Sequence, residues 1–193
     1  MQRILVCSVA LMVGLACGAS NVMISGSLNT PETAYANGLR YLEENAFAKA
    51  RASFQRAQSL DSDYAAAYEG LSRTAHAEGK TNDAIRHIQT AKIKDSGYAP
   101  AWIFTGVLYN SVNRSAAAIV EFQEALIRDK DELWSVTTYY QMALTYEKMD
   151  RTEDAYNSLG EVLKRDTLHM AARAGQERLK DQLPPGFFSP FRH

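Results

Sequence analysis

The chain has 193 residues, of which 46% are hydrophobic and 22% are charged, so it is long enough to fold as one domain with a substantial core. The formal net charge is −1, and acidic and basic residues are mixed along the chain. Nucleic-acid binding depends on a basic surface that releases counterions from phosphates. The composition therefore disfavours nucleic acid, and we expect no nucleic-acid partner.

The N-terminus has the composition of an export signal. Arg3 precedes the apolar run ILVCSVALMVGLAC, and no charged residue follows before Glu32. We predict that residues 1–20 form a bacterial-type signal. The ending GLAC resembles a lipobox, which implies lipidation of Cys17 and a membrane-anchored lipoprotein facing the periplasm or the cell exterior. Two other outcomes remain open: cleavage just after Ala19 or Ser20 by an ordinary signal peptidase, giving a soluble secreted or periplasmic protein, or retention as an uncleaved anchor.

The two cysteines, Cys7 and Cys17, both belong to this segment. After processing, no thiol would remain for a disulfide or for a cysteine-ligated metal. We therefore expect the mature protein to be stabilised by packing alone.

The rest of the chain reads as a short tether over 21–30 followed by helices only. From Glu32 to about Asp181, apolar residues recur at spacings of three and four, and no strand-like alternation occurs. Polar turn signals divide this region at regular intervals, for example at Gly79-Lys80 and at Asn113-Arg114. The pattern predicts a series of helical hairpins.

The hairpins carry an internal repeat. One alanine recurs at intervals of 34, 34 and 37 residues, at Ala50, Ala84, Ala118 and Ala155. Four residues after each alanine stands a larger apolar residue: Phe54, Ile88, Phe122 and Leu159. Twelve residues before each alanine stands a small one: Gly38, Ser72, Gly106 and Ala143. A small residue allows two helices to approach closely, and the bulky residue fills the space beside it.

This order and period resemble the tetratricopeptide repeat family. The resemblance implies an all-α fold, an α-solenoid of four helical hairpins over 31–167, with repeats at 31–64, 65–98, 99–132 and 133–167. We interpret 168–183 as a capping helix, which repeat stacks need for solubility, and 184–193 as an aromatic tail. The tail either folds back onto the last helices or serves as a docking peptide.

The three extra residues before the fourth repeat also have an interpretation. Leu133, Thr137, Tyr140, Leu144 and Glu147 continue one helical face at spacings of four and three. We therefore predict an extra helical turn at the start of that repeat, and not a longer loop.

Nothing in the sequence indicates catalysis. The four histidines have no partner at metal-ligand spacing, and no metalloprotease, nucleophile-elbow or phosphate-loop motif occurs. We predict no enzyme activity and no cofactor.

The resemblance implies a concave groove lined by the first helix of each repeat. Carried over position by position, the partner-binding residues are Tyr35, Leu39, Leu42, Glu69, Arg73, His76, Ile103, Phe104, Val107, Asn110, Tyr140, Leu144 and Glu147, extended by Leu133 and Trp134. The Lys and Asn residues with which some family members hold a peptide C-terminus are missing here. The groove is apolar at both ends, which favours an amphipathic helix or an extended apolar peptide.

These observations predict an interaction adaptor of the bacterial cell envelope, with another protein as its partner. By analogy of architecture, it would serve pilus, secretion or outer-membrane assembly. Two alternatives stay open: a structural subunit whose groove is filled by a neighbour or by its own tail, and an accessory module that binds glycan through groove tyrosines.

Overall fold

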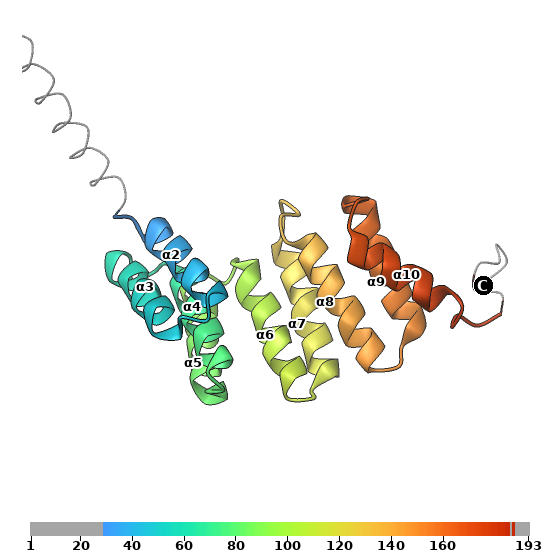
Figure 1. Ribbon diagram of the computed structural model, residues 1–193, viewed down its shortest axis with the longest axis horizontal. Coiled ribbons are helices and arrows are strands. Elements are labelled where there is room, and N and C mark those ends of the chain that lie inside the picture. The colour runs from blue at the N-terminus through green and yellow to red at the C-terminus, as the bar shows by residue number, and fades with distance from the viewer. Residues whose placement is uncertain (1–28, 186, 188–193) are drawn as a thin grey trace, which may run out of the picture.

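The computed structural model describes residues 29–185 and 187. These residues form nine α-helices and no strand, which confirms the all-α prediction (Figure 1). The helices are α2 (Pro31–Glu43), α3 (Phe47–Leu60), α4 (Ala65–Ala77), α5 (Thr81–Lys94), α6 (Ala99–Ser111), α7 (Ser115–Arg128), α8 (Ser135–Lys148), α9 (Thr152–Arg165) and α10 (Met170–Lys180).

The helices pair in chain order and the pairs stack side by side. The four hairpins are α2–α3, α4–α5, α6–α7 and α8–α9, and α10 packs on α9 (Figure 1). The first helices α2, α4, α6 and α8 also contact one another in succession. This is the arrangement of a tetratricopeptide solenoid.

The recurring alanines lie where the two helices of a hairpin meet. Ala50, Ala84, Ala118 and Ala155 have no exposed surface. A Cβ atom placed on Gly38 would lie 2.4 Å from the Phe54 ring, and one on Gly106 would lie 2.5 Å from the Phe122 ring. Since real Cβ atoms do not approach so closely, the bulky residue of the second helix occupies the space that a glycine leaves open. The packing predicted from the repeat is confirmed.

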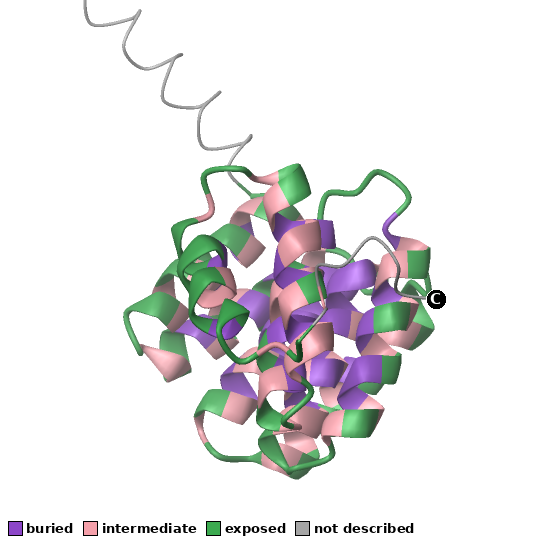
Figure 2. Cartoon of the chain, turned by 90° about the vertical axis from the view of Figure 1, so that its right-hand side faces the viewer, coloured by how far each residue is buried: buried purple, intermediate pink, exposed green. Residues whose placement is uncertain are grey.

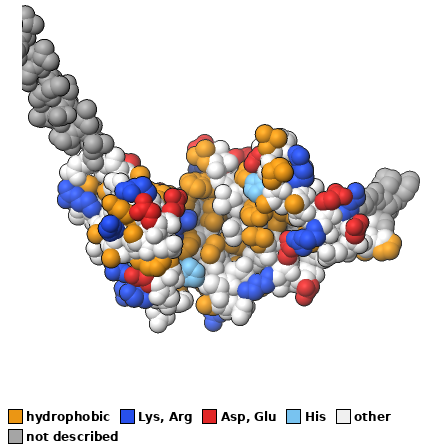
Figure 3. All heavy atoms as spheres, in the orientation of Figure 1, with side chains coloured by type: hydrophobic (Ala, Val, Ile, Leu, Met, Phe, Trp, Pro, Cys, Tyr) orange, Lys and Arg blue, Asp and Glu red, His pale blue; other side chains and the backbone are white. Residues whose placement is uncertain are grey.

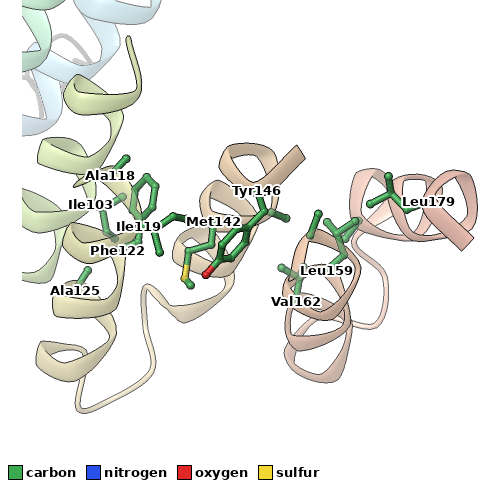
Figure 4. Close-up of a cluster of buried hydrophobic side chains, with 13 residues drawn as sticks. Ile103, Ala118, Ile119, Phe122, Ala125, Met142, Tyr146, Leu159, Val162 and Leu179 are labelled. Atoms are coloured by element: carbon green, nitrogen blue, oxygen red, sulfur yellow. The ribbon is translucent and has the colours of Figure 1, made fainter. Parts of the chain in front are cut away.

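The apolar core is continuous over the C-terminal half of the stack. One cluster joins Phe122 of α7, Met142 and Tyr146 of α8, Leu159 of α9 and Leu179 of α10 (Figure 4). Viewed from the C-terminal end, the buried residues gather between the helices and the exposed ones lie on the outer surfaces (Figure 2). Each hairpin thus covers the apolar face of its neighbour.

The tight turns inside the hairpins use residues that tolerate a left-handed backbone. Asn45, Gly79, Asn113 and Asp150 have φ values of 56°, 76°, 61° and 57°. Glycine, asparagine and aspartate adopt this conformation at the lowest cost. The turn positions are therefore encoded locally.

The prediction of an extra helical turn before the fourth repeat is wrong. α8 begins at Ser135, and residues 129–134 form a loop with Glu132 at a φ of 54°. The buried Asp129 fixes this loop, because its Oδ2 accepts hydrogen bonds from the Trp134 backbone N–H (2.8 Å) and from the Ser135 hydroxyl (2.9 Å). The spacing of apolar residues suggested that the helix would start earlier. The Asp129 carboxylate instead holds residues 129–134 as a loop.

After α10, Phe187 contacts Tyr156 of α9 edge to face, with ring centroids 5.5 Å apart. The predicted signal segment, Cys17, most of the tether, Phe188 and Phe191 lie outside the described residues. Within the part of the chain that the structure describes, no helix combines the length and the apolar character needed to span a membrane.

Candidate partner-binding groove

The face formed by the first helices contains most of the predicted binding residues. Figure 3 shows this side of the molecule with a hollow between the α2–α4 part and the α6–α8 part, and hydrophobic side chains line it. In the α2 part, Tyr35, Leu39 and Leu42 are half-buried and pack against the cluster around Phe54. Their outer surfaces remain open to a ligand.

The polar centre of the groove is a buried network and not an open charged patch. Glu69 of α4 has no exposed surface. Its Oε2 accepts a hydrogen bond from the Tyr35 hydroxyl (3.0 Å), and its Oε1 accepts one from Arg73 Nε. Burial raises the pKa of Glu69, while the positive charge of Arg73 opposes that shift. Burial, followed by the neighbouring Glu69 charge, also raises the pKa of Tyr35.

Arg73 and His76 are half-buried and form the accessible part of this centre. The Arg73 guanidinium lies 5.1 Å from the centroid of the Phe104 ring, and the His76 ring contacts Phe104 edge to face at 5.9 Å. Since Glu69 already neutralises Arg73 and the Phe104 ring is buried, the site offers a partner the Arg73 and His76 side chains with little net charge. Glu69 supports this surface from beneath and has no surface for direct contact.

Two predicted groove residues of α6 belong to the core. Ile103 is 5% exposed and Phe104 is 7% exposed, and both pack in the hydrophobic clusters between hairpins. Val107, one turn later, is half-buried. The amide of Asn110 donates to the Thr145 hydroxyl (3.1 Å) in α8, so it links two hairpins. α6 therefore contributes a narrow strip to the open surface.

The most exposed apolar part of the face belongs to α8. Leu144 is exposed, and Tyr140, one turn earlier, is half-buried against the His169 ring at 5.0 Å. Trp134 and Leu133 are exposed as well, but they lie in the loop before α8 and do not continue its face. Glu147 forms an ion pair with Arg178 of α10 (2.6 Å). The structure brings together Tyr140 and Leu144 and separates Leu133 from them.

Two features of the surface were not predicted. Tyr98, in the loop before α6, is half-buried and interacts with Tyr35 and Glu69; its position outside a helix gave no sign of this role. A cleft of about 690 Å³ lies between α5, α6 and α7, lined in part by Ile85, Gln89 and Tyr109. The repeat pattern does not reveal this cleft, because its width depends on the angle between neighbouring hairpins.

Among residues 29–185 and 187, no group of three histidine, cysteine or acidic side chains is placed to hold a metal ion.

Comparisons with known proteins agree with the repeat architecture. Residues 136–167, which cover most of the fourth hairpin, match the family model described as tetratricopeptide repeat. Among solved structures, the tetratricopeptide protein TTC0263 of Thermus thermophilus superposes with a TM-score of 0.71 at 17% identity, over 88% of this chain and 96% of that one. PilF of Pseudomonas aeruginosa superposes with a TM-score of 0.70 at 18% identity, over 79% of this chain and 68% of that one. PilW, described as a type IV pilus biogenesis factor, superposes with a TM-score of 0.69 at 17% identity, over 79% of this chain and 69% of that one.

One curated protein is similar in sequence. It is the barley (Hordeum vulgare) protein named probable UDP-N-acetylglucosamine–peptide N-acetylglucosaminyltransferase SPINDLY, 30% identical over 97 residues. The match covers 47% of this chain and 10% of the barley protein. This chain thus spans about a tenth of the length of that relative.

Proposed function

Because the chain is built of tetratricopeptide repeats, we propose that it is an interaction scaffold of the bacterial cell envelope that binds a partner protein in its groove. Repeat solenoids present extended surfaces made of one helix from each unit. Here that surface consists of half-buried and exposed apolar side chains around Arg73 and His76, which pack on the buried Phe104 ring. An amphipathic helix or an extended apolar peptide matches these properties.

The observation that carries this proposal is the exposure of Leu144 beside Tyr140 on α8. Leu144 is 42% exposed in the middle of a first helix, on the face that the other first helices share. A large aliphatic side chain on an open face favours a protein contact, since apolar patches on soluble chains are otherwise small. Tyrosine, here Tyr140, is one of the residue types that most often supply the binding energy of an interface.

The envelope part of the proposal rests on the N-terminal sequence and on the fold. Residues 1–20 have the pattern of an export signal, and a lipid on Cys17 would fix the chain to a membrane. The similar fold of PilF and of the pilus biogenesis factor PilW supports a role in assembling a pilus or another envelope complex. In this proposal the chain holds its partner and catalyses no reaction.

The test is a double variant, Tyr140→Ala with Leu144→Ala, in pull-downs from solubilised membranes. We expect loss of the partner recovered by the wild-type chain, with about 2 kcal/mol or more of binding energy removed. The matched control is Val120→Ala, an exposed position on the second helix α7. If the groove variant instead loses thermal stability, and binding falls only in proportion, then Tyr140 and Leu144 are packing residues and the groove proposal is rejected.

A further inference from the structure

The most exposed apolar side chains of the molecule lie on one edge of the stack. This edge is where the first helices begin and the second helices end, and it is the upper edge in Figure 1. Five aliphatic side chains there are between 70% (Ile127) and 81% (Ile93) exposed. We call them the aliphatic edge: Ile93, Ile127, Leu133, Leu168 and Met170. Among the described residues, no other large hydrophobic side chain reaches this exposure.

The five residues form a row across consecutive hairpins. Ile93 and Ile127 occupy equivalent positions in the last turns of α5 and α7. Leu133 lies in the loop before α8, and Leu168 and Met170 lie at the start of α10. The contact between the Tyr140 and His169 rings joins α8 to the segment that carries Leu168 and Met170. Figure 3 shows hydrophobic side chains at the upper margin of the molecule in this region. Single exposed apolar residues are ordinary, but a row along one edge requires an explanation.

The chain outside the described helices joins the same edge. α2 begins there at Pro31, with Thr30 as its N-cap. The 30 residues before Pro31, which include the apolar run from Ile4 to Cys17, therefore join the solenoid at the edge that carries the exposed aliphatic residues. Along the chain, this edge is therefore the part of the solenoid nearest to an anchor in this segment.

We propose that the aliphatic edge lies against a lipid bilayer, with its side chains inserted between the headgroups. This inference does not depend on the groove, but it shares with the proposed function the attachment of the N-terminal segment to a membrane. Apolar residues at the tips of loops gain free energy by leaving water for the acyl boundary. In this orientation the helices stand upright on the membrane, and the groove opens sideways towards a partner.

The charges of the edge indicate the kind of lipid. Acidic side chains outnumber basic ones along it: Asp61, Asp63, Asp95, Asp131, Glu132 and Asp166 against Lys94, Arg128, Lys130 and Arg165. Some of them neutralise one another across hairpins, as in Lys94 with Asp63 (2.8 Å) and Arg165 with Glu132 (3.0 Å). Attraction to anionic lipids requires a cluster of basic residues, and this edge carries an excess of acidic ones instead. The proposal therefore commits to a zwitterionic surface and to contact that salt weakens little.

Trp134 provides the probe, because it is exposed beside Leu133 on this edge. The other tryptophan, Trp102, is half-buried between Arg128 and Lys92 and can be replaced by phenylalanine, which keeps an aromatic ring there. The full chain with Trp102→Phe is reconstituted into phosphatidylcholine and phosphatidylethanolamine vesicles with brominated acyl chains. We expect Trp134 to lose most of its emission relative to unbrominated vesicles.

Two matched variants complete the experiment. In the first, Trp102→Phe and Trp134→Phe are combined with Val112→Trp, which places the single tryptophan on the opposite edge. The emission of this tryptophan should be the same in brominated and unbrominated vesicles. In the second, Leu133→Ser, Leu168→Ser and Met170→Ser are added to the Trp102→Phe chain. The chain should still float with the vesicles through its N-terminal segment, while quenching of Trp134 is lost.

Several outcomes overturn the proposal. The first is that Trp134 emits equally in brominated and unbrominated vesicles. The second is that its quenching survives the triple serine change, and the third is that the full chain does not float with vesicles. A vesicle-free dimer that the triple change abolishes would assign the edge to a second copy of the chain. Failure of the groove proposal is recognised separately, since it concerns the effect of Tyr140 and Leu144 on partner recovery and not the emission of Trp134.

Discussion

At the residue scale, the fold depends on glycines and alanines opposite large side chains. Gly38 and Gly70 both face the ring of Phe54, one from the same hairpin and one from the next. Each glycine in a helix costs conformational entropy, about 0.5–1 kcal/mol relative to alanine. At these positions the cost is offset by the buried ring that the missing side chain admits.

The same substitution at two glycines should therefore have opposite effects. A Cβ on Gly106 would lie 2.5 Å from the Phe122 ring, so Gly106→Ala should destabilise the chain by about 1–3 kcal/mol through overpacking. A Cβ on Gly160 of α9 meets only the end of the flexible Gln176 side chain, at 3.3 Å. Gly160→Ala should therefore gain up to about 1 kcal/mol of helix propensity. Thermal unfolding followed by circular dichroism measures both, and shifts of the same sign would contradict the assigned packing.

Glu69 should give the stability an unusual dependence on pH. Burial raises its pKa in the folded chain above the unfolded value, so the folded state takes up this proton first as the pH falls. The stability that this carboxyl group contributes is then fully present at pH values below its pKa in the unfolded chain. It is lost as the pH rises through its pKa in the folded chain. Compared with Glu69→Gln, the wild-type chain should gain stability towards acid.

Glu78 is the control for this measurement. Its hydrogen bond from Arg51 lowers the pKa of the carboxyl group, so its contribution is lost as the pH falls through that lowered value. The difference in melting temperature between wild type and Glu78→Gln should therefore shrink towards acid. Parallel curves for the two variants would show that the Glu69 network does not have the assigned electrostatics.

At the element scale, the sequence predicted the helices and hairpin turns well and the loop before α8 badly. Apolar spacing identifies which residues share a helical face, and it was right for Tyr140 and Leu144. It cannot show where a helix begins, because that depends on which polar group satisfies the first free backbone N–H groups. Here Asp129 accepts one of them, the Trp134 N–H, together with the Ser135 hydroxyl, from the far end of a six-residue loop.

Removing the Asp129 carboxylate should loosen this loop and the start of α8. Asp129→Ala leaves the Trp134 N–H and the Ser135 hydroxyl without their acceptor in a site that is 7% exposed. The expected loss is about 1–2 kcal/mol, as for an N-cap residue. Asp131→Ala, an exposed position in the same loop, should change stability little. Limited proteolysis within 129–134 provides the second readout, and equal cleavage of both variants would remove Asp129 from this role.

At the scale of the whole molecule, the periodicity fixed the order of the hairpins but not the openness of their faces. Ile103 and Phe104 occupy groove positions of the repeat pattern and are nevertheless buried. Their burial depends on how far neighbouring hairpins rotate against each other, which is a property of the stack and not of one repeat. For the same reason the row of exposed residues on the aliphatic edge appears only when the hairpins are placed side by side.

The role of α10 as a cap leads to the last prediction. Leu179 and Ala172 of α10 are buried, and α10 covers Leu159 of α9 through Gly175. A chain that ends at Thr167 would expose this face of α9, at a cost of at least about 2 kcal/mol in the local opening of the fourth hairpin. Because each hairpin of a stack contacts only its neighbours, the loss should fade along the chain and leave α2 to α5 unaffected.

Hydrogen exchange read helix by helix distinguishes this gradient from a global effect. The control is a chain that ends at Pro185, which retains α10 and removes only the tail. We expect amide exchange to accelerate in α8 and α9 for the shorter chain and to match the wild type in α2 to α5 for both. Acceleration by the same factor in every helix would mean that the stack unfolds as one cooperative unit. In that case α10 would be an integral part of a single domain, with no separate capping role.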